Sequence, residues 1–354
     1  SSAASDVYKR QHLAMAYYYL GCLLYDRRVY DESIEDYEES ILRSPDFPTV
    51  HRNLALAYYN VKKLPQRAYE EMEKAFALDE TDARVYLELD QLKKRLNVAV
   101  KERWSDMEKH FDLVESRDDL YLEYVTLLNT LGEPEKALGL IKARKFHQWE
   151  GGEGKVAAQY LTALYQLAKA AVEKEDYAEA KELLLRAVGE YPHNLGEGKL
   201  ESGQENNLYY LLGLVQEKLG EAKDAFESLT RACCGESEPV GMMYYNDQPP
   251  EMIYYQGLAY RMLGEEEQAV RRFQKLVDYG REHIRDDVKI DYFAVSLPDL
   301  LIFEENLNER NRKHCLFMMS LGLKGLGRID EAEKCAEELL AMDNAHQEIR
   351  VHDL

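Results

Sequence analysis

The chain has 354 residues, of which 31% are charged, and a formal net charge of −21. This length exceeds the ~250–300 residues that one hydrophobic core usually serves, so several packing units are expected. The acidic balance argues against nucleic acids and anionic membrane surfaces as partners, because both require clustered basic side chains. It favours either a long soluble surface or an acidic groove for a basic partner.

No apolar run is long enough to span a bilayer, and no N-terminal signal peptide is visible. The five cysteines, Cys22, Cys233, Cys234, Cys315 and Cys335, do not have the spacing of a disulfide framework. This pattern is typical of a reducing compartment, so we expect a cytoplasmic protein without membrane insertion.

A glycine followed by a small residue recurs along the chain and divides it into helical pairs. Small residues let two helices cross closely. Residues 1–13 are predicted as a linker or tag remnant with the start of the first helix. Residues 14–145 are predicted as compact repeats, with a degenerate unit near 84–118. Residues 146–354 continue the repeats with inserts at about 146–156, 192–206, 235–250 and 283–313. Three pairs share a spacing of 12 residues: Gly21 with Ser33, Gly213 with Ala225, and Gly257 with Ala269.

These phrases resemble the tetratricopeptide repeat, a helix–turn–helix unit of about 34 residues. The first copy carries Tyr17, Leu20-Gly21, Leu24, Ser33, Tyr37, Ser40 and Pro45. The resemblance implies an all-α fold, a right-handed α-solenoid of about eight helix–turn–helix units. It also implies a scaffold that binds a protein, a peptide or another domain of the same polypeptide.

In this family the first helix of each unit lines a concave surface, and Tyr and Arg are favoured at binding hot spots. A peptide-terminus clamp would need several Lys, Arg and Asn side chains to converge, but here they come from separated repeats. The alternative is that most of the tyrosines pack between repeats with the hydroxyl at the rim. By resemblance, the groove residues are Tyr18, Tyr25, Arg52, Tyr59, Asn60, Asn129, Tyr165, Tyr210, Tyr254 and Arg261.

The inserts hold the chain's most unusual polar chemistry, and Gly-Glu-Gly-Lys occurs in two of them, at 152–155 and 196–199. Inserts of successive repeats emerge on one edge of a solenoid and can meet in a composite site. Three interpretations remain open: loops that cap helix ends, a surface that docks another domain, or a pocket for a polar ligand such as a sugar. The candidate residues are His147, Trp149, Glu150, Lys155, Glu197, Lys199, Asn206, Tyr245, Asn246, Asp247, Asp291 and Asp299.

Catalysis, cofactors and metals are not expected for this chain. Neither Gly-Glu-Gly-Lys is a phosphate-binding loop, because Val156 and Leu200 stand where that motif has Ser or Thr. His147 with Glu150 and Glu153 has a helix-like spacing, but the glycines between them oppose a helix. Acidic pairs such as Asp291 and Asp299 suit a glycosidase only at a carboxyl separation that sequence does not give.

As a group, the sequences of the inserts resemble the C-terminal repeat region of a family of large bacterial proteins. The phrases are 146–155, 194–200, 244–250 and 289–299, together with 52–59. Members of that family carry an uncharacterised, β-rich N-terminal region related to carbohydrate-active enzymes. The resemblance implies that this chain is a fragment. It also implies an alternative function, an accessory module whose inserts help to build a carbohydrate-binding or glycoside-processing site.

Overall fold

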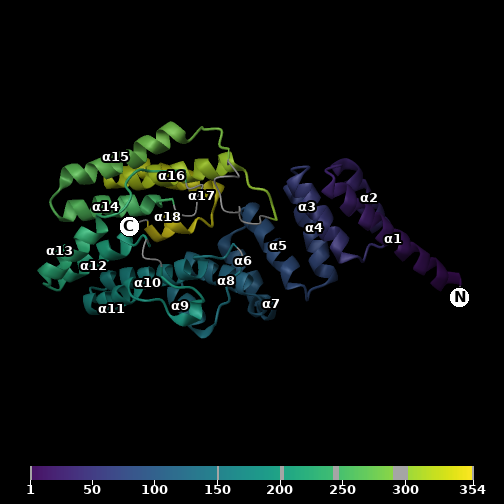
Figure 1. Cartoon of the computed structure of the whole chain (residues 1–354), viewed down its shortest axis with the longest axis horizontal. Coiled ribbons are helices and arrows are strands. Elements are labelled where there is room, and N and C mark those ends of the chain that lie inside the picture. Colours follow the sequence, from purple (N-terminus) through teal and green to yellow (C-terminus); the bar gives the residue numbers. More distant parts are fainter. Residues whose placement is uncertain (1, 150, 200–202, 242–246, 290–301, 353–354) are drawn as a thin grey trace. The chain divides into compact units, whose positions relative to one another are not determined.

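The computed structural model describes residues 2–149, 151–199, 203–241, 247–289 and 302–352. Within these ranges the regular structure is entirely helical, which confirms the predicted all-α fold (Figure 1). The chain divides into two compact units. Unit 1 comprises Ser1–Tyr121 and Leu300–Glu305, and unit 2 comprises Leu122–Asp299 and Asn306–Leu354.

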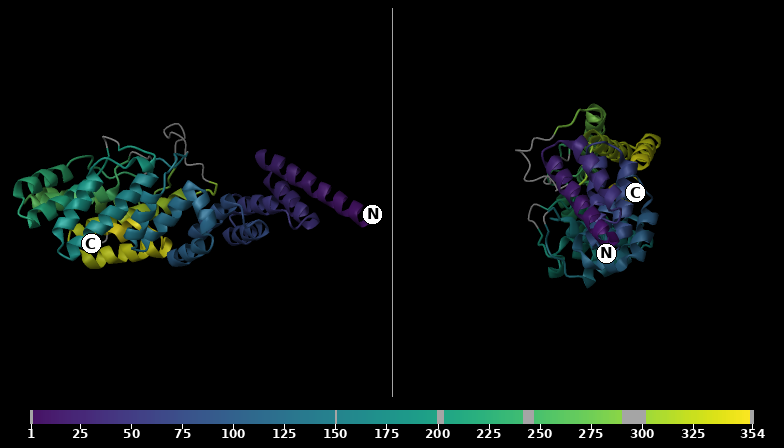
Figure 2. Two further views of the ribbon diagram at one scale, coloured as in Figure 1. Left: turned by 90° about the horizontal axis from the view of Figure 1, so that it is seen from below. Right: turned by 90° about the vertical axis from the view of Figure 1, so that its right-hand side faces the viewer.

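Unit 1 is built from helical pairs. The helices α1 and α2 pack side by side, as do α3 and α4 (Figure 2). In the third pair two short helices replace the second partner, in the region where the sequence predicts a degenerate unit. The helices are α1 (Ser2–Asp26), α2 (Tyr30–Arg43), α3 (Pro48–Asn60), α4 (Pro65–Leu78), α5 (Ala83–Arg95), α6 (Val100–Lys109) and α7 (Phe111–Ser116).

Close helix crossings explain the small residues of the repeat. The Ser33 hydroxyl donates a 2.7 Å hydrogen bond to the carbonyl oxygen of Gly21, so a small side chain of α2 bonds directly to the backbone of α1. A Cβ atom added at Gly21 would lie 2.8 Å from the Tyr37 ring. A larger side chain at either position would therefore separate the pair.

Unit 2 contains most of α8 and all later helices. Each helix from α10 to α16 packs against the next one along the chain or its repeat partner. A Cβ atom at Gly257 would lie 2.4 Å from the Phe273 ring, which repeats the close crossing of unit 1. The helices are α8 (Asp118–Thr130), α9 (Pro134–Ala143), α10 (Lys155–Glu173), α11 (Tyr177–Val188), α12 (Asn206–Lys218), α13 (Ala222–Ala232), α14 (Pro250–Met262), α15 (Glu266–His283), α16 (Leu307–Gly325), α17 (Ile329–Met342) and α18 (Gln347–His352), with a 3₁₀ turn at His193–Leu195.

The turn inside each helical pair needs one residue in the left-handed conformation. Glycine fills this position in some repeats, as at Gly264, where φ is 81°. In other repeats a residue with a side chain adopts the same conformation, as at Arg28, Lys63 and Glu175, with φ between 53° and 62°. The sequence shows only the glycine turns, because a charged residue carries no comparable signal.

Two segments outside the helical pairs lie against the repeats. In unit 1, Ile302–Glu305 contacts α3 and α5. In unit 2, the short C-terminal helix α18 lies beside α10 and contacts α8, α10 and α14 (Figure 1). These two segments mark the surfaces described next.

Candidate functional site

In unit 1, three of the predicted groove residues surround the segment Ile302–Glu305. The Asn60 side chain donates from Nδ2 to the carbonyl oxygen of Ile302 at 2.9 Å. Its Oδ1 atom accepts the backbone N–H of Glu304, also at 2.9 Å. One amide thus binds the main-chain groups on both sides of Phe303. Tyr25 and Tyr59 lie beside this contact, and burial raises the pKa of Tyr25 above its usual value.

Phe303 is the anchor of this segment, with 0% of its side chain surface exposed. Its ring meets the Tyr59 ring edge to face at 5.1 Å between centroids, a geometry worth about 0.5–1.5 kcal/mol beyond area burial. Arg95 lies over both rings and donates to the Phe303 carbonyl oxygen at 2.9 Å. Lys63 pairs with Glu304 at 2.6 Å, but both side chains are about two-thirds exposed, at 65% and 64%.

The other predicted groove residues of unit 1 have internal partners. Arg52 forms a bidentate ion pair with Glu88, with nitrogen–oxygen distances of 2.6 and 2.7 Å. Glu88 is 0% exposed and also accepts from Arg84 at 3.1 Å, so Arg52 neutralises a buried charge. Tyr18 packs against Phe47, with 5.1 Å between ring centroids, and burial raises its pKa. These two side chains therefore stabilise the unit.

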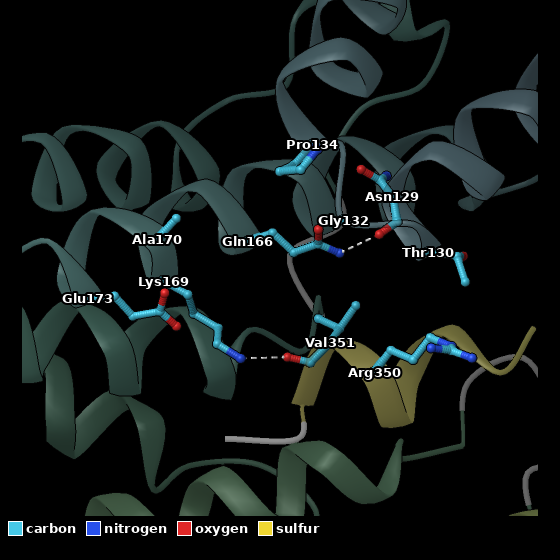
Figure 3. Close-up of a pocket in the computed structure, with 10 residues that line it drawn as sticks. All are labelled: Asn129, Thr130, Gly132, Pro134, Gln166, Lys169, Ala170, Glu173, Arg350 and Val351. Carbon is cyan, nitrogen blue, oxygen red and sulfur yellow. Dashed lines mark hydrogen bonds between the residues drawn. The ribbon is translucent and has the colours of Figure 1, made fainter. Parts of the chain in front are cut away.

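In unit 2, α18 lies against α8, α10 and α14. Gln347 donates to the carbonyl oxygen of Thr126 and to the hydroxyl of Thr130, both at 3.1 Å. Lys169 donates from Nζ to the carbonyl oxygen of Val351 at 2.9 Å (Figure 3). The helix is thus held partly through its own main chain, as Ile302–Glu305 is held in unit 1.

A buried cluster of aromatic side chains holds the end of α18. The hydroxyls of Tyr165 and Tyr255 lie 2.6 Å apart, and the Tyr255 hydroxyl lies 3.1 Å from Nδ1 of His352. Burial lowers the pKa of His352 to about 3, so this imidazole is neutral at physiological pH. The predicted residues Tyr210 and Tyr254 pack against Tyr255, at 5.5 and 5.4 Å between ring centroids.

Sequence reasoning missed Tyr255 and His352, which lie at the centre of this cluster. Tyr255 is the second member of a tyrosine pair, and the pair gives no signal of which ring turns inward. The predicted residue Arg261 pairs with Glu266 at 2.9 Å and donates to the Gly325 carbonyl oxygen at 2.9 Å. It therefore ties α14 to α15 and α16.

A pocket of about 240 Å³ opens beside α18 (Figure 3). Asn129 donates from Nδ2 to Gln159, and its buried Oδ1 has no hydrogen-bond partner among the described residues. Gln166 donates to the Asn129 carbonyl oxygen at 3.0 Å. The pocket is lined by Asn129, Thr130, Gly132, Pro134, Gln166, Lys169, Ala170, Glu173, Arg350 and Val351.

Two of the described insert residues, Glu197 and Asn206, bind backbone groups at helix ends. The Glu197 carboxylate accepts the backbone N–H groups of Gly154 and Ala157, both at 2.7 Å, and so caps the N-terminus of α10. Asn206 donates to the carbonyl oxygens of Ala232 and Cys234 at the end of α13, at 2.8 and 2.7 Å. Within this part of the chain, the geometry favours the capping interpretation over a composite ligand site.

The other insert residues do not gather at one point. Lys199 pairs with Glu205 at 2.7 Å, and the Trp149 ring lies against Gly152. His147 and Lys155 are exposed, and Asp247 is half-buried. Within the described ranges, no group of His, Cys, Asp or Glu side chains is placed to hold a metal ion. The candidates Glu150, Tyr245, Asn246, Asp291 and Asp299 lie outside those ranges.

None of the helices in the described ranges is both long and apolar enough to cross a bilayer. The tetratricopeptide-repeat family models match residues 18–83, 165–239 and 251–279. Among solved structures, MamA is 17% identical, with a TM-score of 0.21 and coverage of 74% of this chain and 95% of that one.

PilF of Pseudomonas aeruginosa is 15% identical, with a TM-score of 0.25 and coverage of 76% of this chain and 93% of that one. Yeast Tom70 is 13% identical, with a TM-score of 0.30 and coverage of 92% and 68%. Similarity at this level supports no argument about function. In the three segments matched by the family models the helices form pairs, so these segments are similar to tetratricopeptide repeats in both sequence and helical arrangement.

Proposed function

We propose that this chain is a protein-interaction scaffold that binds polypeptide segments on the inner faces of its repeats. One observation supports the proposal most directly: in each unit, side chains on repeat helices bind main-chain groups of a segment outside the repeats. Asn60 does so in unit 1, and Lys169 does so in unit 2. Main-chain groups are common to all polypeptides, so these contacts support a protein or peptide as the partner.

Tetratricopeptide repeats are typically scaffolds, and we propose no catalytic role for this chain. The groove residues that support the proposal are those that hold a chain segment, Tyr25, Tyr59 and Asn60 in unit 1. In unit 2, Tyr165 packs against His352 of α18, and Asn129 lines the pocket beside that helix. The net charge of −21 disfavours partners with a large negative charge by long-range repulsion.

The test is affinity capture with matched variants, in lysate of the source organism. The full chain is compared with an Asn60→Ala, Lys169→Ala double variant and with a Lys223→Ala control, whose side chain is exposed on α13. We expect a set of proteins that the wild type and the control retain and the double variant loses. Calorimetry with one purified member of that set should give saturable binding. Retention of the same proteins by all three baits would refute binding through these faces.

The alternative proposal is an accessory module for carbohydrate binding or glycoside processing, in a larger bacterial protein with a β-rich N-terminal region. It rests on the resemblance of the insert phrases alone. Calorimetric titration of simple oligosaccharides into the full chain tests it. Saturable binding that Trp149→Ala abolishes would favour the accessory module, and no heat of binding would favour the scaffold.

A further inference from the structure

The contacts around Phe303 have the character of a peptide-binding site. Three main-chain groups are bound by side chains of unit 1: the carbonyl oxygens of Ile302 and Phe303 and the N–H of Glu304. Asn60 at the end of α3 and Arg95 at the end of α5 supply all three contacts. Such contacts recognise a backbone conformation and tolerate any side chain on the bound segment.

Two further contacts give the site a side-chain preference. The position of Phe303 is fully buried against Tyr59 and Arg95, which suits an aromatic ring. The next position faces Lys63, which suits a carboxylate. An aromatic residue followed by an acidic residue therefore satisfies every contact seen here.

We infer that unit 1 carries a binding site for non-helical peptides with an aromatic residue followed by a carboxylate residue, and that Ile302–Glu305 occupies this site as an internal competitor. This inference rests on the proposed scaffold function and names its partner class. The internal segment is held by three main-chain hydrogen bonds, one buried ring and an exposed ion pair, and an incoming peptide of the same kind would restore each of these contacts. Because the competitor is tethered, it lowers the apparent affinity of every such peptide.

The experiment uses the full chain and a fluorescent peptide, Leu-Ile-Phe-Glu-Glu-Asn, which copies residues 301–306. Binding is measured by fluorescence anisotropy. The variant Phe303→Ala removes the internal anchor and leaves Tyr59, Asn60 and Arg95 intact. We expect it to bind the peptide roughly tenfold or more tighter than the wild type, because the incoming ring can fill the vacated position.

A second variant keeps the test valid if Phe303→Ala does not fold. Glu304→Pro removes the N–H that Asn60 accepts, and it changes a residue that is mostly exposed. It should bind the peptide more tightly than the wild type for the same reason. Helical circular dichroism and the thermal unfolding midpoint confirm that each variant is folded.

Asn60→Ala in either background should weaken peptide binding roughly tenfold, since two main-chain hydrogen bonds are lost. Leu42→Ala, at an exposed position on α2, is the matched control and should change nothing. A peptide with alanine in place of phenylalanine should not bind.

The inference is overturned if folded variants bind the peptide no better than the wild type, or if Asn60→Ala has no effect. It is also overturned if wild-type chains form dimers that the peptide dissociates, because the occupant would then come from a second copy. The scaffold proposal survives each of these results if the captured proteins remain sensitive to the double variant. Conversely, if the peptide binds but no protein is captured, the peptide site is supported and the scaffold proposal is refuted.

Discussion

The substitution Glu251→Gln should stabilise unit 2 at neutral pH. Glu251 is the second residue of α14 and is only 8% exposed. Burial, together with the nearby carboxylate of Glu348 on α18, raises its pKa to about 8. The ordinary value is 4.5, so the folded chain holds a proton that the unfolded chain releases at neutral pH.

The magnitude follows from proton linkage. A folded pKa above the unfolded value lowers stability as pH rises from about 4.5 to about 8, because the unfolded state ionises first. Each tenfold change in proton affinity corresponds to about 1.4 kcal/mol, so the penalty at pH 7 is on the order of 3 kcal/mol. We expect Glu251→Gln to gain roughly 1–3 kcal/mol at pH 7–8 and little near pH 4.5.

The assay must report unit 2 alone. Trp149 lies in unit 2 and Trp104 in unit 1, so urea unfolding is followed by Trp149 fluorescence in a Trp104→Phe background. The variant Glu267→Gln changes an exposed carboxylate and serves as the control. If Glu251→Gln and the parent show the same stability difference between pH 5 and pH 8, the assigned pKa of Glu251 is wrong.

Three further substitutions test the packing of the repeats. Glu88→Gln should destabilise unit 1 by about 3 kcal/mol, measured by urea unfolding followed by Trp104 fluorescence, because two arginines lose their buried counter-charge. Gly257→Val should lower the thermal midpoint of unit 2 and its free energy of unfolding by about 1–3 kcal/mol, because the new Cβ atom would lie 2.4 Å from the Phe273 ring. An unchanged midpoint would contradict this close helix crossing. Glu175→Gly should raise that midpoint and increase the free energy of unfolding by about 1 kcal/mol, because a φ of 59° strains any residue with a Cβ atom. Destabilisation would show that the turn is not strained.

The repeat architecture could be read from the sequence because it depends on local signals. Glycine and a small residue 12 positions later mark a helix crossing, and Gly21 with Ser33 shows the contact behind the pattern. The occupant of unit 1 could not be read in this way. Asn60 and Ile302 are separated by 242 residues, and their contact uses main-chain atoms that leave no trace in residue identity.

The aromatic cluster of unit 2 shows a second limit. Sequence patterning places tyrosines on first helices, but it does not fix the rotation of each helix about its axis. Tyr254 and Tyr255 are adjacent, and both are buried, yet only Tyr255 meets His352. His352 gives no signal of its own, because one histidine near the end of a helix is ordinarily a surface residue.

The two internal segments, α18 and Ile302–Glu305, differ in how firmly they are held. This difference decides which of them a partner peptide can displace. α18 buries Ile349, Val351 and His352, and full burial of an aliphatic side chain stabilises by about 1.5–3 kcal/mol. Its release would also expose the hydrogen-bonded pair Tyr165 and Tyr255. Ile302–Glu305 buries one ring and ends in an exposed ion pair. A partner peptide therefore has to displace fewer buried side chains in unit 1 than in unit 2. We accordingly regard α18 as the firmly held segment and Ile302–Glu305 as the one that an incoming peptide can displace.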